Sequence, residues 1–181
     1  MNEKWANWVS RVIVALVLFS DLQGWAQSRS GSKAPVITHA FTVERIRYGD
    51  VLKVYIEAED PGGDMVKIAT VVDQAGYGRY PTSWVYVKPT DRKHFKGYLQ
   101  WNTFSTMASH LSEWTHVTLT VSVFNKSGNE SNVFAFPMTF ETGIKRASSY
   151  PAPPPFNQKD VSRLGFIDID LVDPTIIRDD E

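Results

Sequence analysis

The stretch HVTLTVSVF, residues His116–Phe124, decides the fold class of this chain. Its apolar side chains alternate strictly with small polar ones: Val117, Leu119, Val121 and Val123 fall on one side, and Thr118, Thr120 and Ser122 on the other. A period of two is the pattern of a β-strand with one buried face and one solvated face. The β-branched residues favour the same conformation. We therefore expect this stretch to be a strand of a sheet that covers a core.

Segments of the same kind lie on both sides of this strand. Alternating or β-branched runs occupy Pro35–Val43, Leu52–Glu59, Val66–Val72, Ser83–Lys88, Lys96–Phe104 and Asn132–Glu141. Pro137 in the last run indicates an edge strand or a bulge, and Ser105–Trp114 could form a short helix that crosses between sheets. About seven short strands with turn residues between them predict an all-β, immunoglobulin-like antiparallel sandwich. A small barrel remains the alternative, because spacing does not count the sheets.

Two stretches resemble known modules. IEAEDPGGD, residues Ile56–Asp64, is similar to the Ala-x-Asp-Pro-x-Gly-Asp turn of bacterial immunoglobulin-like, cadherin-like and polycystic-kidney-disease-like repeats. LTVSVFNKSGNES, residues Leu119–Ser131, resembles the penultimate strand and following turn of the same modules. Phe124 and Asn125 depart from the Ala and Asp that are common there, and the cysteine pair of antibody domains is absent. The resemblance implies a β-sandwich and a habit of binding, not an activity.

The N-terminus has the layout of a secretory signal peptide. Lys4 and Arg11 precede the apolar run Val12–Ser20, and Gly24 and Ala26 are the small residues expected before a cleavage site. The run is too short to cross a bilayer. We expect residues 1–26 to be a signal peptide, 34–143 an immunoglobulin-like domain and 144–181 a Pro-rich linker with a strand-like tail. The alternatives at the N-terminus are an uncleaved anchor or a buried helix. The mature protein would be periplasmic or extracellular.

Composition limits the partners and the source of stability. The chain has no cysteine, so an exported domain of this kind must rely on burial and strand pairing instead of disulfides. The formal net charge is −1, with basic and acidic residues interspersed. Nucleic acids and anionic membranes select clustered Lys and Arg. The sequence therefore disfavours both, and after signal cleavage no integral membrane span is expected.

The turn EAEDPGGDM, residues Glu57–Met65, has two interpretations. Carboxylates at Glu59, Asp60 and Asp64, with backbone carbonyls, could bind calcium. Alternatively the turn is only a corner, in which Pro61 presets φ, the glycines permit positive φ and an aspartate accepts bonds from the turn amides. We favour the corner and keep calcium as the alternative; no other cofactor is expected.

Aromatic residues supply the candidate contacts. The loop around Tyr77 and Tyr80 is rich in glycine, and Trp84 and Trp101 lie on two of the expected strands. Exposed aromatic side chains could pack against a protein or stack on sugars. The competing interpretation is that many of them fill the core. A carbohydrate-binding module would need a coplanar row of exposed rings.

The C-terminal tail follows a proline-rich stretch, Ala147–Asp160, that should be extended. Beyond it RLGFIDIDLVD alternates again, with Phe166 and Ile169 among its apolar residues. Such a segment can cover an edge of its own sandwich, add as a strand to another molecule, or be disordered.

Catalytic signals are weak. The four histidines do not show zinc spacing, no Gly-x-Ser-x-Gly elbow occurs, and no carboxylate pair assigns acid and base roles. The sequence as a whole predicts an exported, non-catalytic module with a structural or protein-interaction role at a bacterial envelope or cell surface. A carbohydrate-binding module and a calcium-stabilised adhesion domain are the alternatives.

Overall fold

Ten strands run through the part of the chain that the structure, a computed structural model, describes: residues 33–106, 108, 111, 113–158 and 161–174. They are β1 (Val36–Phe41), β2 (Arg45–Ile46), β3 (Val51–Glu59), β4 (Met65–Gln74), β5 (Gly78–Arg79), β6 (Ser83–Tyr86), β7 (His94–Asn102), β8 (His116–Asn125), β9 (Phe134–Phe140) and β10 (Ser162–Ile167). Two short 3-10 turns, Pro89–Asp91 and Ala147–Ser149, interrupt the connections. The expected signal peptide lies outside the described residues, and so do parts of Ser105–Trp114.

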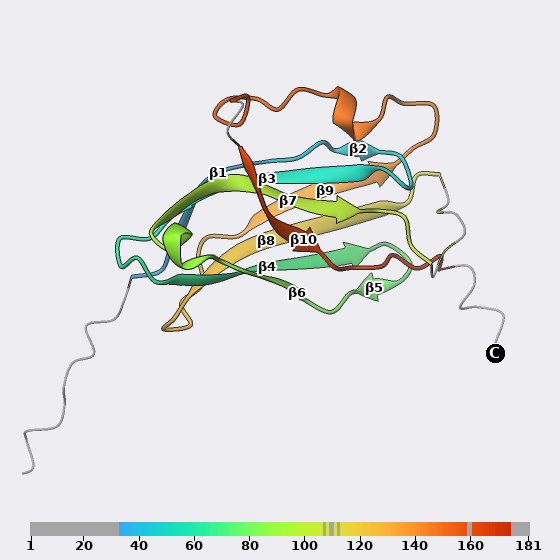
Figure 1. Cartoon of the computed structure of the whole chain (residues 1–181). Helices are drawn as coiled ribbons and strands as arrows, with labels where there is room; N and C mark the ends of the chain where they lie inside the picture. Colours follow the sequence, from blue (N-terminus) through green and yellow to red (C-terminus); the bar gives the residue numbers. More distant parts are fainter. Residues whose placement is uncertain (1–32, 107, 109–110, 112, 159–160, 175–181) are drawn as a thin grey trace, which may run out of the picture. The chain divides into compact units, whose positions relative to one another are not determined.

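The strands form two sheets that face each other (Figure 1). Sheet A has the order β1-β3-β7-β10, and sheet B has the order β2-β9-β8-β4-β5, with β6 also paired to β4. Most pairs are antiparallel, whereas β10 with β7 and β2 with β9 are parallel. Sheet A lies in front of sheet B in the view of Figure 1.

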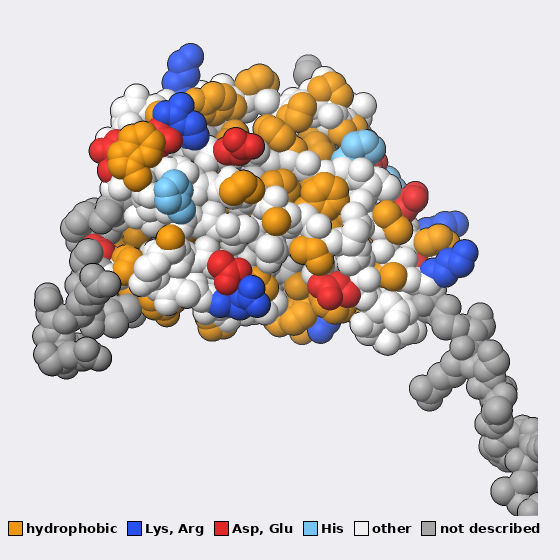
Figure 2. Space-filling view, turned by 180° about the vertical axis from the view of Figure 1, so that it is seen from behind, with side chains coloured by type: hydrophobic (Ala, Val, Ile, Leu, Met, Phe, Trp, Pro, Cys, Tyr) orange, Lys and Arg blue, Asp and Glu red, His pale blue; other side chains and the backbone are white. Residues whose placement is uncertain are grey.

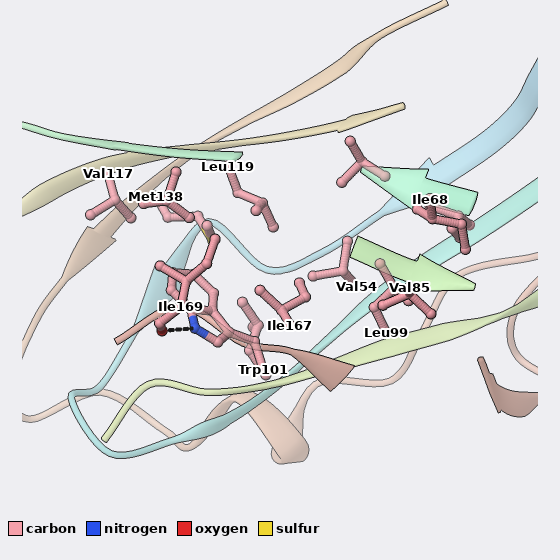
Figure 3. Packing of buried hydrophobic residues seen from close by; sticks show 14 of the residues in the cluster. Val54, Ile68, Val85, Leu99, Trp101, Val117, Leu119, Met138, Ile167 and Ile169 are labelled. Carbon is pink, nitrogen blue, oxygen red and sulfur yellow. Dashed lines mark hydrogen bonds between the residues drawn. The ribbon is translucent and has the colours of Figure 1, made fainter. Parts of the chain in front are cut away.

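The core lies between the sheets because each strand turns its apolar alternate residues inward. On β8 the inward side chains Val117, Leu119, Val121 and Val123 are at most 2% exposed, and β3 contributes Leu52, Val54 and Ile56 in the same way. Figure 3 shows side chains from both sheets meeting in this layer. The prediction of an all-β sandwich is therefore confirmed. Sequence reasoning missed β2 and β5, which have two residues each.

Strand order matches the immunoglobulin-like arrangement with one substitution. In that arrangement one sheet contains strands A, B, E and D, and the other contains C, F and G. Here β1, β3 and β7 take the places of A, B and E, while β4, β8 and β9 take those of C, F and G. Strand D would follow β6, but only a short connection with one 3-10 turn joins β6 to β7. The place of D is filled by β10, from the C-terminal end of the described chain.

The tail is an integral part of this sandwich. Ile167, Ile169 and Leu171 are at most 6% exposed, and the indole Nε1 of Trp101 donates to the Ile169 carbonyl at 2.9 Å (Figure 3). The Asp168 amide donates to Oγ of Ser83 at 2.9 Å. Of the three uses that the sequence left open for the tail, the structure therefore has the first: the segment docks on its own domain.

Two glycines allow this docking. A Cβ at Gly97 of β7 would lie 2.6 Å from both Cγ of Leu164 and the Ser162 carbonyl oxygen. A Cβ at Gly165 would lie 2.3 Å from Cγ1 of Val85 on β6. Any other residue would therefore hold β10 away from both neighbouring strands.

Candidate interaction surface

Four side chains from three neighbouring strands form a patch on the outer face of sheet B. We call Lys67, Trp84, Tyr86 and Phe124 the aromatic patch. Lys67 is the Cα partner of both Tyr86 on β6 and Phe124 on β8. Its Nζ lies 3.8 Å from the centre of the Trp84 ring and 5.5 Å from that of Phe124. A lysine is thus held among aromatic rings, where cation–π attraction orders its long side chain.

The patch is open to solvent on its outer side. Trp84 is 41% exposed and Tyr86 is 77% exposed. The neighbouring outward side chains toward the middle of the sheet are small: Ala69, Val71, Thr120 and Ser122. Figure 2 looks onto this side of the molecule and shows hydrophobic side chains over its middle, with some charged side chains among them. Exposed aromatic side chains beside small uncharged ones have the composition of a protein-interaction core.

Two rings of the patch, those of Trp84 and Phe124, are not coplanar. Trp84 and Phe124 meet edge to face, with centroids 5.6 Å apart and planes at 66°. One face of Trp84 is already taken by Lys67. Stacking on a sugar needs a free ring face, so this geometry suits a protein contact better than a carbohydrate platform.

The outer face of sheet A differs because the proline-rich connection crosses part of it. Phe156 is only 4% exposed, and its ring lies 5.4 Å from that of Tyr55 on β3. Tyr55 in turn lies 5.7 Å from Tyr98 on β7. The connection thus covers an aromatic ladder that would otherwise be open.

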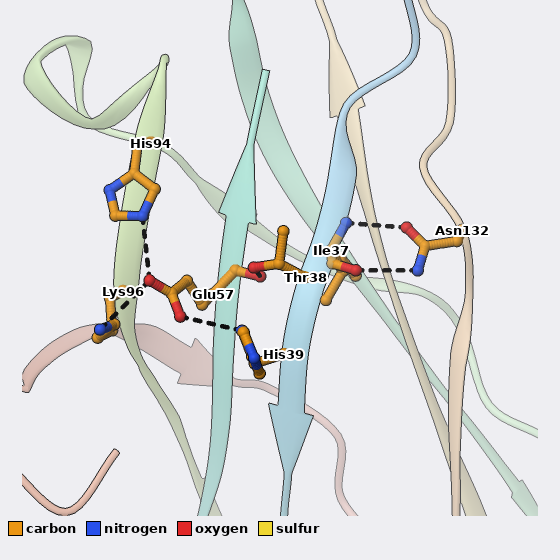
Figure 4. A network of polar contacts seen from close by, with 7 residues as sticks. All are labelled: Ile37, Thr38, His39, Glu57, His94, Lys96 and Asn132. Carbon is orange, nitrogen blue, oxygen red and sulfur yellow. Dashed lines mark hydrogen bonds and ion pairs between the residues drawn. The ribbon is translucent and has the colours of Figure 1, made fainter. Parts of the chain in front are cut away.

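A polar network occupies another part of the sheet A face (Figure 4). The carboxylate of Glu57 on β3 meets Nδ1 of His39 at 3.2 Å, Nε2 of His94 at 3.1 Å and Nζ of Lys96 at 3.3 Å. Burial alone would raise the pKa of Glu57, but the hydrogen bonds from His94 and Lys96 outweigh it and lower that pKa. The network joins β1, β3 and β7 through one carboxylate.

Three of the expected contact residues are buried. Trp101 is 0% exposed, Ile169 is 6% exposed and Tyr80 is 6% exposed. The outward positions of β7 belong instead to Tyr98 and Gln100, since Trp101 shares the inward face with Leu99. Trp101 and Tyr80 hold the tail against the sandwich, and Ile169 is a buried residue of the tail itself. Phe166 is 54% exposed, with the Arg163 guanidinium 4.3 Å from its ring centre.

The Tyr77 loop also contributes to docking of the tail. Tyr77 is 41% exposed and stacks on Tyr80 with ring centroids 4.6 Å apart. The Tyr80 hydroxyl accepts the Val172 amide at 2.8 Å and donates to Oε1 of Gln74 at 2.6 Å. Nε2 of Gln74 donates to the Val172 carbonyl at 2.8 Å. Two side chains of this loop region therefore hold both backbone groups of one tail residue.

This contact predicts a loss of stability at alkaline pH. Burial raises the pKa of Tyr80 to about 12, although the Val172 amide acts in the opposite direction. The pKa of Tyr80 in the folded state lies above its ordinary value. The contribution of the Tyr80 hydroxyl to the free energy of unfolding is therefore fully present below about pH 10 and is lost as pH rises toward about 12. Allowing for solvent screening, we expect it to be at most about 2 kcal/mol. Urea unfolding across this pH range measures it.

A matched pair of variants isolates the hydroxyl. Tyr80→Phe should be less stable than the parent at about pH 8, by about 1–2 kcal/mol for the lost hydrogen bonds, and should lack the alkaline loss. Tyr77→Phe keeps the Tyr80 hydroxyl and should retain that loss. An unchanged alkaline loss in Tyr80→Phe would contradict the assignment.

The acidic turn has the geometry of a corner. The two carboxylate oxygens of Asp60 accept the amides of Gly62 at 2.9 Å and Asp64 at 3.1 Å, and Asp60 is 1% exposed. Gly63 has φ 67°, as the turn requires. Glu59 is exposed at the end of β3. Across the described residues there is no group of three or more His, Asp or Glu side chains placed to hold a metal ion.

The fold and these surfaces define a two-sheet β-sandwich module of immunoglobulin-like strand order. No helix within the described residues is long and apolar enough to cross a membrane. No protein-family model and no curated protein matches the sequence. Among solved structures, the chain is similar to the CARDB domain of a Pyrococcus furiosus protein, crystallised in complex with di-metal ions: identity is 11%, the match covers 59% of this chain and 86% of that one, and the TM-score is 0.32.

Proposed function

We propose that this chain is an exported, non-catalytic immunoglobulin-like module with a structural or protein-interaction role at the bacterial envelope or cell surface. We further propose that it binds its protein partner through the aromatic patch. The observation that carries this proposal is the set of exposed aromatic side chains of Trp84 and Tyr86 around Lys67, with small, uncharged side chains next to them toward the middle of the sheet. Aromatic residues that protrude from such a face are typical of interface hot spots.

Charge supports a protein partner over a nucleic acid. The formal net charge is −1, and the patch carries one lysine whose ammonium group is already engaged with ring faces. Binding to a phosphate backbone needs several basic side chains in a row.

Site-specific photo-crosslinking tests the binding surface. A photoreactive phenylalanine analogue at Tyr86 should crosslink to one discrete partner in intact cells. The same analogue at His39, which is exposed on the outer face of sheet A and lies away from β10, should not. With the purified partner, Trp84→Ala and Tyr86→Ala should each weaken binding at least about tenfold. Their melting temperatures should change little, since both side chains are exposed.

Other outcomes distinguish the alternatives. Saturable binding of an oligosaccharide that Trp84→Ala abolishes, without a protein crosslink, would support the carbohydrate-binding module. Equal crosslinking from Tyr86 and His39 would contradict the patch as the binding surface. The export proposal is tested separately, by N-terminal sequencing of the protein from cell fractions: the mature chain should begin near Gln27, and a cytoplasmic chain that begins at Met1 would contradict it.

A further inference from the structure

Most lateral edges in the described part of the sandwich are short or partly capped. At the edge of β1, the side chain of Asn132 makes both hydrogen bonds that a neighbouring strand would make to Ile37. The Ile37 amide donates to Oδ1 of Asn132 at 2.8 Å, and Nδ2 of Asn132 donates to the Ile37 carbonyl at 3.0 Å (Figure 4). In sheet B, β2 and β5 have two residues each. Capped or very short edges resist strand addition.

The outer edge of β7 is different. This nine-residue strand pairs with β3 on one side, and on the other side only with β10. β10 also packs beside β6, so that it lies between the two sheets along one side of the sandwich. The β7 edge is thus a long acceptor, and its occupant comes from the C-terminal part of the chain.

The occupant can leave without opening the rest of the sheet. As the last strand of the described chain, β10 pairs with β7 alone. The strand pairs among β1, β3, β4, β7, β8 and β9 do not depend on it. An edge strand that is paired to one neighbour is the kind of element that two copies of a protein can exchange.

The groups that bind β10 contact only residues 162–173 and do not contact the connection that precedes them. The clearances at Gly97 and Gly165, the bond from Trp101 to the Ile169 carbonyl and the bonds at Val172 involve residues 162–173 and the sandwich. The same segment from another copy would make the same contacts. Whether the segment docks on its own sandwich or on that of a second copy therefore depends on the connection and on protein concentration, because the contacts are the same in both cases.

The connection between β9 and β10 is long enough for docking on the same chain or on a second copy. Phe156 is the buried side chain nearest to β10 on the connection, and Asn157 and Gln158 beyond it are exposed. Residues 157–161 alone can span roughly 17 Å when extended, and residues 141–161 roughly 70 Å. A formal net charge of −1 means that two copies repel each other only weakly.

We propose that the β7 edge is a strand-acceptor site for a second copy of this chain, so that two copies exchange residues 162–173 and form a dimer. Each sandwich in this dimer contains the same ten strands, one of them supplied by its partner. The proposal does not use the aromatic patch, which stays exposed on both copies.

Disulfide trapping tests the exchange, since the chain has no cysteine of its own. Gln100 and Phe166 are Cα partners across β7 and β10, and their side chains lie on the outer face. One tagged chain carries Gln100→Cys and a differently tagged chain carries Phe166→Cys. When the two are refolded together and oxidised, we expect a disulfide-linked heterodimer whose yield rises with protein concentration. Light scattering of the unsubstituted chain after the same refolding should show a dimer.

The controls make each outcome decisive. A single chain with both substitutions should form the bond internally when dilute, which confirms that the two positions meet. Pairing Phe166→Cys with Thr118→Cys, on the outer face of sheet B, should give no heterodimer. Equal yields from the matched and mismatched pairs, or a monomer by light scattering at every concentration, would overturn the proposal.

Discussion

Replacing Trp101 by alanine is expected to lower the free energy of unfolding by about 3–5 kcal/mol. The side chain is 0% exposed and lies between β7 and the tail (Figure 3). The substitution leaves a cavity and also leaves the Ile169 carbonyl without its donor. Chemical denaturation followed by far-ultraviolet circular dichroism measures the change.

Two further variants divide this loss into its causes. Trp101→Phe keeps most of the packing and removes the indole donor, so it should cost about 1–3 kcal/mol. Trp84→Ala removes the same kind of side chain from a site that is 41% exposed, and should cost less than about 1 kcal/mol. A similar cost for Trp101→Ala and Trp84→Ala would contradict the assignment of Trp101 to the core and Trp84 to the surface.

Replacing Gly165 by alanine is expected to cost about 1–3 kcal/mol, although it adds one methyl group at the edge of the molecule. The new Cβ would lie 2.3 Å from Cγ1 of Val85, on a β-branched side chain that cannot easily rotate away. Either β10 moves outward or β6 does. Urea unfolding and protease sensitivity of the tail report the two effects.

A double-mutant cycle shows whether the cost comes from this contact. Val85→Ala removes the clashing methyl groups and alone should cost about 1–2 kcal/mol. Combined with Gly165→Ala it should recover at least about 1 kcal/mol relative to the sum of the single variants. Additive costs would place the effect of Gly165 elsewhere. Phe166→Ala, at the neighbouring exposed position, is the control and should change stability little.

The strands themselves could be predicted because alternation is a local signal. β8 was expected over His116–Phe124 and occupies His116–Asn125. The two-residue strands β2 and β5 are too short for alternation to be seen. The segment Lys96–Phe104 illustrates a different limit. Alternation separates Tyr98 from Trp101, but both sides carry an aromatic residue, so the pattern does not say which side is buried.

The surfaces depend on long-range contacts that one sequence does not contain. The aromatic patch joins Lys67, Trp84 and Phe124 from three strands, and sequence reasoning found only Trp84 among them. The tail was identified as strand-like, yet its parallel neighbour β7 lies far earlier in the chain. The sequence indicates that the Gly-rich Tyr77 loop is not part of the core. Its function in docking depends on Val172, whose backbone groups bond to Gln74 and Tyr80 from far along the chain.

The place of β10 has a consequence for the order in which the strands can fold. The strand that completes sheet A follows all the strands that it joins, so β1 to β9 are synthesised before it. Until β10 docks, the β7 edge is open and the core lacks the side chains of Ile167, Ile169 and Leu171. The nine earlier strands therefore cannot reach the full stability of the sandwich by themselves, and sheet A closes last.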